Sequence, residues 1–249
     1  MNERTGRMIG AGLLAVAVVG GVGFTAVRVA GADRDAGKPV WNFPKADAKG
    51  QDGQASKDPS GLRALLLPYD SGTIGYGRGP DIGEFGSDAA LSGREATALS
   101  KQEIRDLPPQ ALRKVTELID KERIKGMAVR SYAALDRYDT NDRALTISFE
   151  LVRMENSASV RSLSTTQNEF LAGSRIFSKG PAIKGYENAA CFLTPTKADA
   201  KLDRMVCSAY VGDVLVTVNA SGQHPLGTNA VALLIGRQLD RIKDPGKAV

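Results

Sequence analysis

Residues 191–222, CFLTPTKADAKLDRMVCSAYVGDVLVTVNASG, carry the pattern that decides the fold. Three short, largely apolar runs lie at 191–194, 205–211 and 214–220. Gly212-Asp213 makes a tight turn between the last two runs. The stretch therefore predicts a three-stranded antiparallel meander.

Both cysteines of the chain lie in the first two of these predicted strands. In a hairpin centred on Asp199, Cys191 and Cys207 are each eight residues from the centre and face each other across the sheet. Closing so short a loop stabilises a protein by about 3 kcal/mol in an oxidising compartment. We predict a structural disulfide, with a reactive thiol pair or two free buried thiols as alternatives; the spacing is not that of a CxxC redox motif.

The flanking sequence extends the same fold. Residues 127–135 and 144–152 predict two more strands, joined by a turn at Asp139–Asp142. Helical spacing of apolar residues is present at 92–99, at 100–107 with Ser100 and Glu103 as a capping box, after Pro108-Pro109, at 157–172 and at 225–242. The order predicts an α+β fold, with an antiparallel sheet of about five strands and helices packed on one face, preceded by a single N-terminal transmembrane helix.

That transmembrane prediction rests on residues 9–27, IGAGLLAVAVVGGVGFTAV, nineteen residues without a charge or a proline. As a helix the segment is about 28 Å long, close to the thickness of a bilayer core. We expect a cytoplasmic tail at 1–8, a transmembrane anchor or uncleaved signal at 9–30, a flexible linker at 31–61 and an extracytoplasmic α+β domain at 62–249. The alternative is secretion after cleavage near Ala32, because Ala30-Gly31-Ala32 fits a signal-peptidase site.

Composition excludes several classes of site. One histidine and two cysteines cannot form a His/Cys metal site or a four-cysteine cluster within one chain. The net charge is +5 for 249 residues and +3 without the first 32, which is too small and too evenly spread to indicate nucleic acid. The glycine-rich stretch 69–86 matches neither GxGxxG nor GxxxxGK[ST], so we expect a long ordered surface loop there and no cofactor.

Three groups of residues are weak candidates for chemistry. His224 is the single possible histidine of a Ser-His-Asp triad, but no GxSxG motif is present, so we expect a loop residue. Asp81, Glu84 and Asp88 are the acidic cluster of the glycine-rich stretch, and Arg175, Lys179 and Lys184 form a small basic cluster; turn, cap and solvated positions explain both.

From Leu62 onward, the segments GYGRGPDIGEFG, IKGMAVRSY, KGPAIKGYENAACFL, CSAYVGDVLV and RQLDRIKDPG resemble an uncharacterised family of actinobacterial membrane-anchored or secreted proteins. More remotely, the layout is similar to extracellular sensor domains of bacterial Ser/Thr kinases. That resemblance implies an α+β fold with disulfides and a cleft for an unidentified ligand. It carries over no catalytic residue.

We therefore expect a membrane-anchored extracytoplasmic domain, not an enzyme, that binds a ligand or a cell-envelope partner. Its partners are the membrane, through the N-terminal helix, and an unknown envelope ligand or protein, but no nucleic acid. Two alternatives remain open. A structural or assembly partner in the envelope predicts a large exposed apolar patch. A carboxylate-dependent envelope hydrolase predicts two carboxyl groups in one cleft, within roughly 10 Å of each other.

Overall fold

The computed structural model describes residues 58, 60–69, 75–134, 145–174, 176–195 and 200–246. The predicted tail, the predicted anchor at 9–30, most of the predicted linker and the turn at Asp139–Asp142 lie outside these ranges. Within the described ranges, no helix has the length and apolar character needed to cross a membrane.

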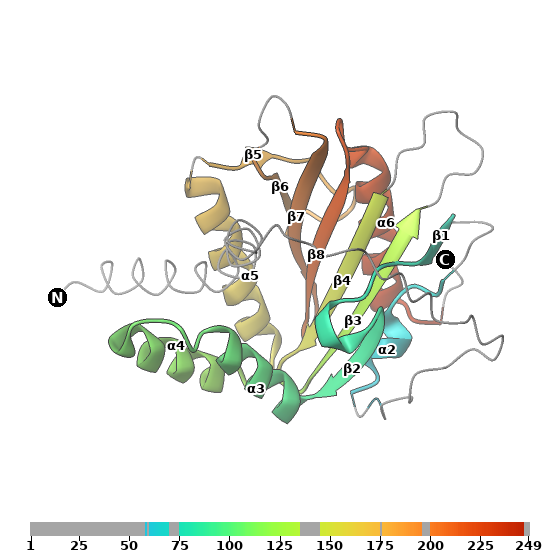
Figure 1. Ribbon diagram of the computed structural model, residues 1–249. Helices are drawn as coiled ribbons and strands as arrows, with labels where there is room; N and C mark the ends of the chain where they lie inside the picture. The colour runs from blue at the N-terminus through green and yellow to red at the C-terminus, as the bar shows by residue number, and fades with distance from the viewer. Residues whose placement is uncertain are drawn as a thin grey trace, which may run out of the picture.

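An antiparallel sheet forms the centre of the described domain (Figure 1). Its strand order is β1-β3-β4-β8-β7-β6-β5, and β2 also pairs with β3. The strands are β1 (Tyr76–Arg78), β2 (Asp88–Ser92), β3 (Gly126–Ala134), β4 (Leu145–Arg153), β5 (Ser178–Lys179), β6 (Ala190–Leu193), β7 (Leu202–Val211) and β8 (Val214–Gln223). The helices are α2 (Leu62–Leu65), α3 (Gly93–Glu103), α4 (Pro109–Glu122), α5 (Ser157–Gly173) and α6 (Thr228–Lys243), with a short 3-10 helix η1 (Gly83–Phe85).

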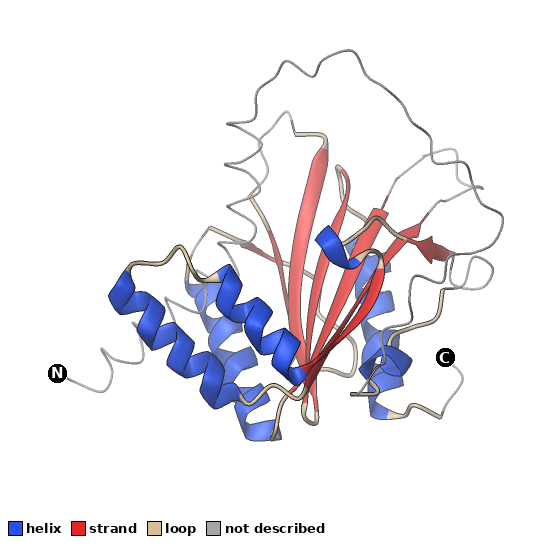
Figure 2. Cartoon of the chain, turned by 60° about the horizontal axis from the view of Figure 1, so that its bottom comes forward, coloured by secondary structure: helices blue, strands red, loops and turns tan. Residues whose placement is uncertain are grey.

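The α+β class is as predicted, but two details of the prediction are wrong. The described part of the sheet has eight strands and not about five, because the short strands β1, β2 and β5 were not predicted. The helices also cover both faces of the sheet and not one (Figure 2). Near its end, the central strand β4 directs apolar side chains to both faces of the sheet, since the neighbouring residues Leu151 and Val152 are both buried. Helices therefore pack on each face.

Helices α2 and α6 cover the more apolar face. Phe149 of β4 and Val216 of β8 are fully buried there, against Leu62 of α2 and Ile235 of α6. The buried amide of Gln238 joins the two helices: its Oε1 accepts from the Leu67 amide at 3.0 Å, and its Nε2 donates to the carbonyl of Leu65 at 2.8 Å. This pairing satisfies backbone groups at the end of α2 that burial otherwise leaves without partners.

Helices α3 and α5 lie on the opposite face, where Ala96 and Val160 pack against Met127 and Val152. Helix α4 packs on α3 through a separate small cluster that contains Ile104. The predicted break of α3 at Ser100 is wrong. One continuous helix runs from Gly93, and the capping box is formed by Ser92 and Glu95. The Ser100 hydroxyl donates to the Ala96 carbonyl inside that helix instead.

The predicted meander is β6, β7 and β8, and its register places Cys191 opposite Cys207. The two residues form a disulfide, with Cα atoms 4.1 Å apart. Both are buried in the core below α6. The disulfide therefore links the short strand β6 to the long central strands and closes a loop with a sequence separation of 16.

We predict that the free energy of unfolding of the double variant Cys191→Ala/Cys207→Ala is about 2–4 kcal/mol lower than that of the wild type. The unfolded chain of the variant regains the conformational entropy that the disulfide-closed loop removes. Denaturant titration of both proteins measures the difference. Reductant should bring the wild-type protein close to the variant and leave the variant unchanged. Equal stabilities with and without reductant would contradict the structural role of the disulfide.

Candidate functional site

The sheet face below α3 and α5 becomes polar along the central strands. Side chains alternate between faces in a strand, so Ser148 and Glu150 of β4 share this face with Thr217 and Asn219 of β8, the residues paired with Glu150 and Ser148. The helices do not cover the whole row, and two pockets remain open above it. Ser148 and Asn219 line both pockets. We call the two pockets together the polar groove.

The first pocket, here the hydroxyl pocket, has a volume of about 380 Å³. Its floor is formed by polar side chains of four neighbouring strands, among them Ser131, Thr146, Ser148, Arg204, Asn219 and Ser221. The chain at Pro80, Asp81 and Ile82 forms its rim. The Ser131 and Thr146 hydroxyls donate to backbone carbonyls, so the hydrogen-bonding groups left for a ligand include the Ser148 hydroxyl and the Asn219 amide.

Gly79 explains why the rim lies so close to the sheet. A Cβ atom at this position would be 2.6 Å from the Tyr132 amide nitrogen, so only glycine permits the approach to β3. The Gly79 amide donates to the Ser131 carbonyl at 3.0 Å, and the Ser131 hydroxyl donates to the Pro80 carbonyl. The glycine-rich stretch predicted as a surface loop therefore includes an ordered wall of the groove.

The second pocket, here the carboxylate pocket, has a volume of about 460 Å³. Part of its wall is aliphatic and comes from helices and strands alike, including Ile104, Val115, Ile119, Met127, Leu163 and Leu215. Three carboxyl groups line it as well, Glu103 of α3, Glu122 of α4 and Glu150 of β4. None of the described residues that line this pocket is a lysine, an arginine or a histidine.

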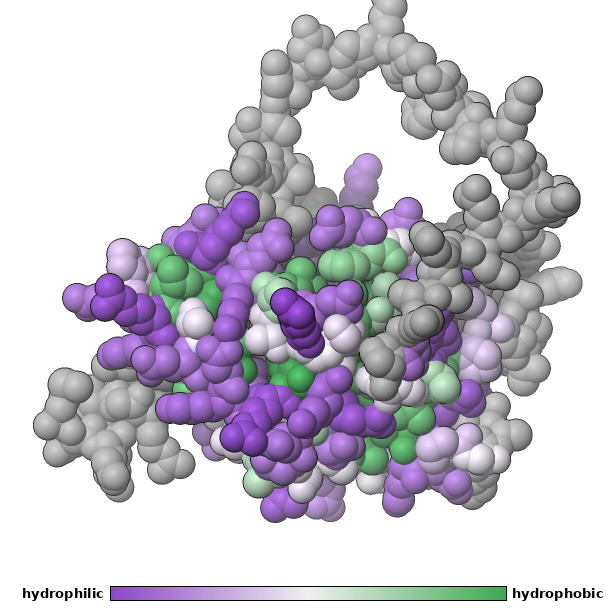
Figure 3. Space-filling view, turned by 90° about the horizontal axis from the view of Figure 1, so that it is seen from below, coloured by the Kyte–Doolittle hydropathy of each residue, from purple (hydrophilic) through white to green (hydrophobic). Residues whose placement is uncertain are grey.

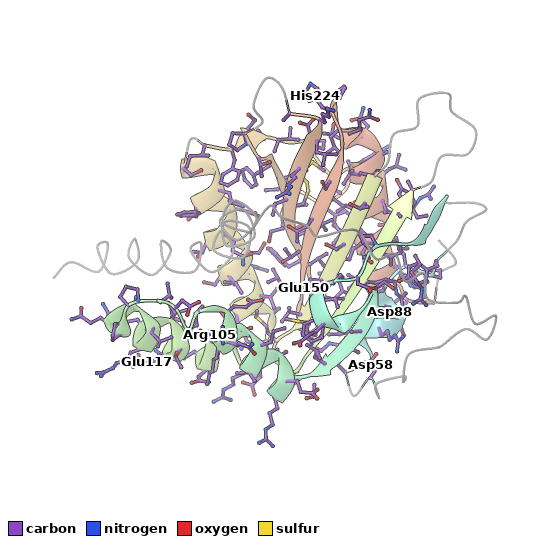
Figure 4. All side chains as sticks on the ribbon, in the orientation of Figure 1. Asp58, Asp88, Arg105, Glu117, Glu150 and His224 are labelled. Atoms are coloured by element: carbon purple, nitrogen blue, oxygen red, sulfur yellow. A yellow bond between two sulfur atoms is a disulfide. The ribbon has the colours of Figure 1, made fainter. Side chains whose placement is uncertain are left out.

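Glu150 is the most deeply placed of the three, at the middle of the sheet (Figure 4). Its side chain is partly buried and lines the pocket. Burial, together with the nearby charge of Glu103, raises the pKa of Glu150 to about 7. The described part of the chain gives its carboxyl group neither a hydrogen-bond partner nor a salt bridge.

The other two carboxyl groups lie closer to the rim. Burial raises the pKa of Glu122 to about 7, and it also raises the pKa of Glu103. Each of the three groups comes from a different element, so the cluster depends on the packing of α3 and α4 beside the sheet. A salt bridge of 2.6 Å between Lys101 and Asp120 helps to hold α3 against α4 on their outer side.

The predicted acidic cluster does not converge. Asp81 lies on the rim of the hydroxyl pocket, and Glu84 is exposed on η1 outside both pockets. The Oδ2 of Asp88 accepts from Arg63 at 2.8 Å and from Arg130 at 3.1 Å. Burial alone raises the pKa of Asp88, but the hydrogen bonds from both arginines outweigh it and hold that pKa below its ordinary value. Asp88 thus holds α2 to β2 and β3.

His224 has an acidic partner that sequence reasoning did not foresee. Its Nδ1 lies 2.9 Å from Oδ2 of Asp203, and the same oxygen accepts from the Leu226 amide at 2.9 Å. Within the described residues, no hydroxyl group contacts the other ring nitrogen. The pair therefore fastens the loop before α6 to β7, and α6 begins at Thr228 and not at the predicted Pro225.

The remaining candidates add little. Lys179 and Lys184 are exposed, and Arg175 lies outside the described residues. In the described ranges, no group of three histidine, cysteine, aspartate or glutamate residues has a geometry that holds a metal ion.

Sequence reasoning missed the carboxylate pocket for an identifiable reason. Glu103 matches a local capping pattern, and Glu150 has the place of an exposed residue in an alternating strand. The signal that could have found Glu150 is its position in a central strand, which a second helical layer covers in the structure.

No protein-family model matches this chain, and no curated protein matches it either. Among solved structures, the chain is similar to the crystal structure of the extracellular domain of PknH from Mycobacterium tuberculosis. The similarity covers 76% of this chain and 97% of that chain, at 11% identity and a TM-score of 0.40. A similarity this weak carries no argument about function.

We predict that Glu150→Gln changes how stability depends on pH. A native pKa of about 7 exceeds the ordinary glutamate value of 4.5, so the native state keeps a proton that the unfolded state has already lost. Wild-type stability should therefore fall between about pH 4.5 and about pH 7, by on the order of 2 kcal/mol for this group, with the fall complete above that window.

The variant should lose this contribution and be the more stable protein near pH 8. Denaturant midpoints measured across the range test the difference. Glu117→Gln, on the exposed side of α4, is the matched control and should follow the wild-type profile. Parallel profiles for wild type and Glu150→Gln would contradict the assignment.

Proposed function

We propose that the chain is a membrane-anchored extracytoplasmic protein whose α+β domain binds a ligand in the polar groove without transforming it. The observation that carries the proposal is the groove itself. Its pockets, about 380 and 460 Å³, have the volume of small-molecule sites, and a few polar groups lie among aliphatic walls.

Two observations support the location. The disulfide between Cys191 and Cys207 is typical of proteins that fold in an oxidising compartment. The uncharged segment at 9–27 has the length of a transmembrane helix and precedes the domain in the chain. Together they favour a domain on the outer side of the plasma membrane, either anchored or, after cleavage near Ala32, secreted.

A purely structural envelope protein receives less support. Large exposed apolar side chains among the described residues are Ile176, Leu202 and Leu233, which belong to different parts of the fold. Seen from below, most of the surface is hydrophilic and the apolar areas are separate (Figure 3).

A carboxylate-dependent hydrolase is the second candidate, and one observation favours it. Glu103 and Glu150 interact in one pocket, and the pKa of about 7 at Glu150 suits a general acid near neutral pH. The two functions differ in the fate of the bound compound: a binding domain returns it intact, and a hydrolase returns cleavage products. Mass spectrometry of compounds recovered from the groove separates them.

We predict that Ser148→Phe abolishes ligand binding, because Ser148 lines both pockets and a phenyl ring there fills the floor of the groove. Phenylalanine is favoured in strands, so the sheet should persist. A thermal-shift screen of soluble fragments on the full-length protein in a neutral detergent gives the readout.

The matched control for this screen is Ser162→Phe, at an exposed position of α5. Fragments that raise the midpoint of wild type and of Ser162→Phe, but not of Ser148→Phe, support the groove. Fragments that stabilise all three proteins equally argue against it.

The location predicts a defined topology. In intact protoplasts of a bacterium that expresses the tagged full-length chain, external protease should remove the C-terminal tag. Both cysteines should resist thiol reagents until reductant is added. A protected tag with two reactive thiols would place the domain in the cytoplasm and overturn the proposed location.

A further inference from the structure

The carboxylate pocket has a one-sided charge. Glu103, Glu122 and Glu150 reach it from α3, α4 and β4, and no described residue that lines it carries a positive charge. The chain as a whole is basic, with a net charge of +5. The negative charge of the pocket is therefore a local feature that opposes the overall balance.

The surroundings of Glu150 also point to a ligand. Buried carboxyl groups normally have hydrogen-bond donors or a cation beside them, because an unpaired one costs several kcal/mol. Glu150 is partly buried, and its carboxyl group lines the pocket without a hydrogen-bond or salt-bridge partner among the described residues.

The residues that line the carboxylate pocket restrict the chemistry of a ligand that pairs with Glu150. Carboxylate groups attract a cation, but among the described residues no group of three carboxylate, histidine or cysteine side chains has the geometry that holds a metal ion. An organic ammonium ion with an apolar chain meets both conditions. Its nitrogen donates charge-assisted hydrogen bonds to a carboxylate, and its chain buries against Ile119, Leu163 and Leu215.

We infer that the carboxylate pocket binds a small organic ammonium ion with an apolar chain, and that Glu150 is its counter-ion. The inference rests on the proposed function of the groove as a ligand site and names the class of ligand. The ammonium nitrogen donates one hydrogen bond to Glu150. Its remaining N–H groups can donate to the side-chain oxygens of Ser148, Thr217 and Asn219, which also line the pocket.

Three probes of equal chain length test the charge requirement: n-hexylamine, 1-hexanol and hexanoate. Calorimetric titration of the full-length protein in a neutral detergent should show that the amine binds at least about tenfold more tightly than the alcohol, and that the carboxylate does not bind. Amine affinity should rise about tenfold or more between about pH 5.5 and about pH 8, as Glu150 ionises beside Glu103 and Glu122.

Glu150→Gln should weaken amine binding by about tenfold or more, reduce its pH dependence to the part that Glu103 and Glu122 supply, and leave the alcohol unaffected. Glu117→Gln, outside the pocket, should bind the amine as the wild type does. Equal binding of amine and alcohol, or amine binding unchanged in Glu150→Gln, would overturn the inference.

The experiments distinguish a failure of the ammonium assignment from a failure of the proposed function. If none of the three probes binds while the fragment screen yields ligands that Ser148→Phe abolishes, the ammonium assignment fails and the groove remains a binding site. If the screen is empty too, both proposals fail.

Discussion

The alternation of side chains along β4 is the constraint on which the rest of the structure depends. Ile147, Phe149 and Leu151 point to one face and are fully buried, whereas Ser148 and Glu150 point to the other. Because β4 presents only apolar side chains to the first face from Leu145 to Leu151, α2 and α6 cover that face. The second face is polar in the middle, so α3 and α5 pack only where Val152 and its neighbours provide apolar surface. The polar groove is the part of this face that they leave open.

Polar contacts, as well as burial, fix the position of α2 and the residues that follow it, up to Leu67. Gln238 bonds the backbone of Leu65 and Leu67, and Arg130 donates to the Leu67 carbonyl as well as to Asp88. The Tyr132 hydroxyl also donates to the Leu67 carbonyl, at 2.6 Å. These contacts hold α2 and the residues after it against the apolar face of the sheet.

The sequence predicts what local pattern determines and misses what packing determines. The meander, its cysteine register and the two long strands follow from apolar runs and turn residues, and the structure shows them at nearly the predicted positions. The short strands β1, β2 and β5 have no such pattern, because they exist only by pairing with β3 and β6. Ser92 and Ser100 each precede a glutamate by three residues, yet only Ser92 begins a helix. Ala96, which follows Ser92, packs against the sheet and favours a helix that begins there. Because the pattern assigned Glu103 to a cap at Ser100, it did not indicate that Glu103 lines a pocket.

Glu150 connects stability with function in this fold. A sequence selected for stability alone gains by placing an amide or an aliphatic side chain at a buried position without a partner, since such replacements are commonly neutral or stabilising. Here three carboxyl groups from separate elements meet in one pocket, and burial raises the pKa of each. Unfavourable groups of this kind are concentrated at sites where a ligand or a proton completes them. The cost of leaving Glu150 unpaired in the free protein becomes binding energy for a cation, because the cation relieves the repulsion from Glu103 as it pairs with Glu150.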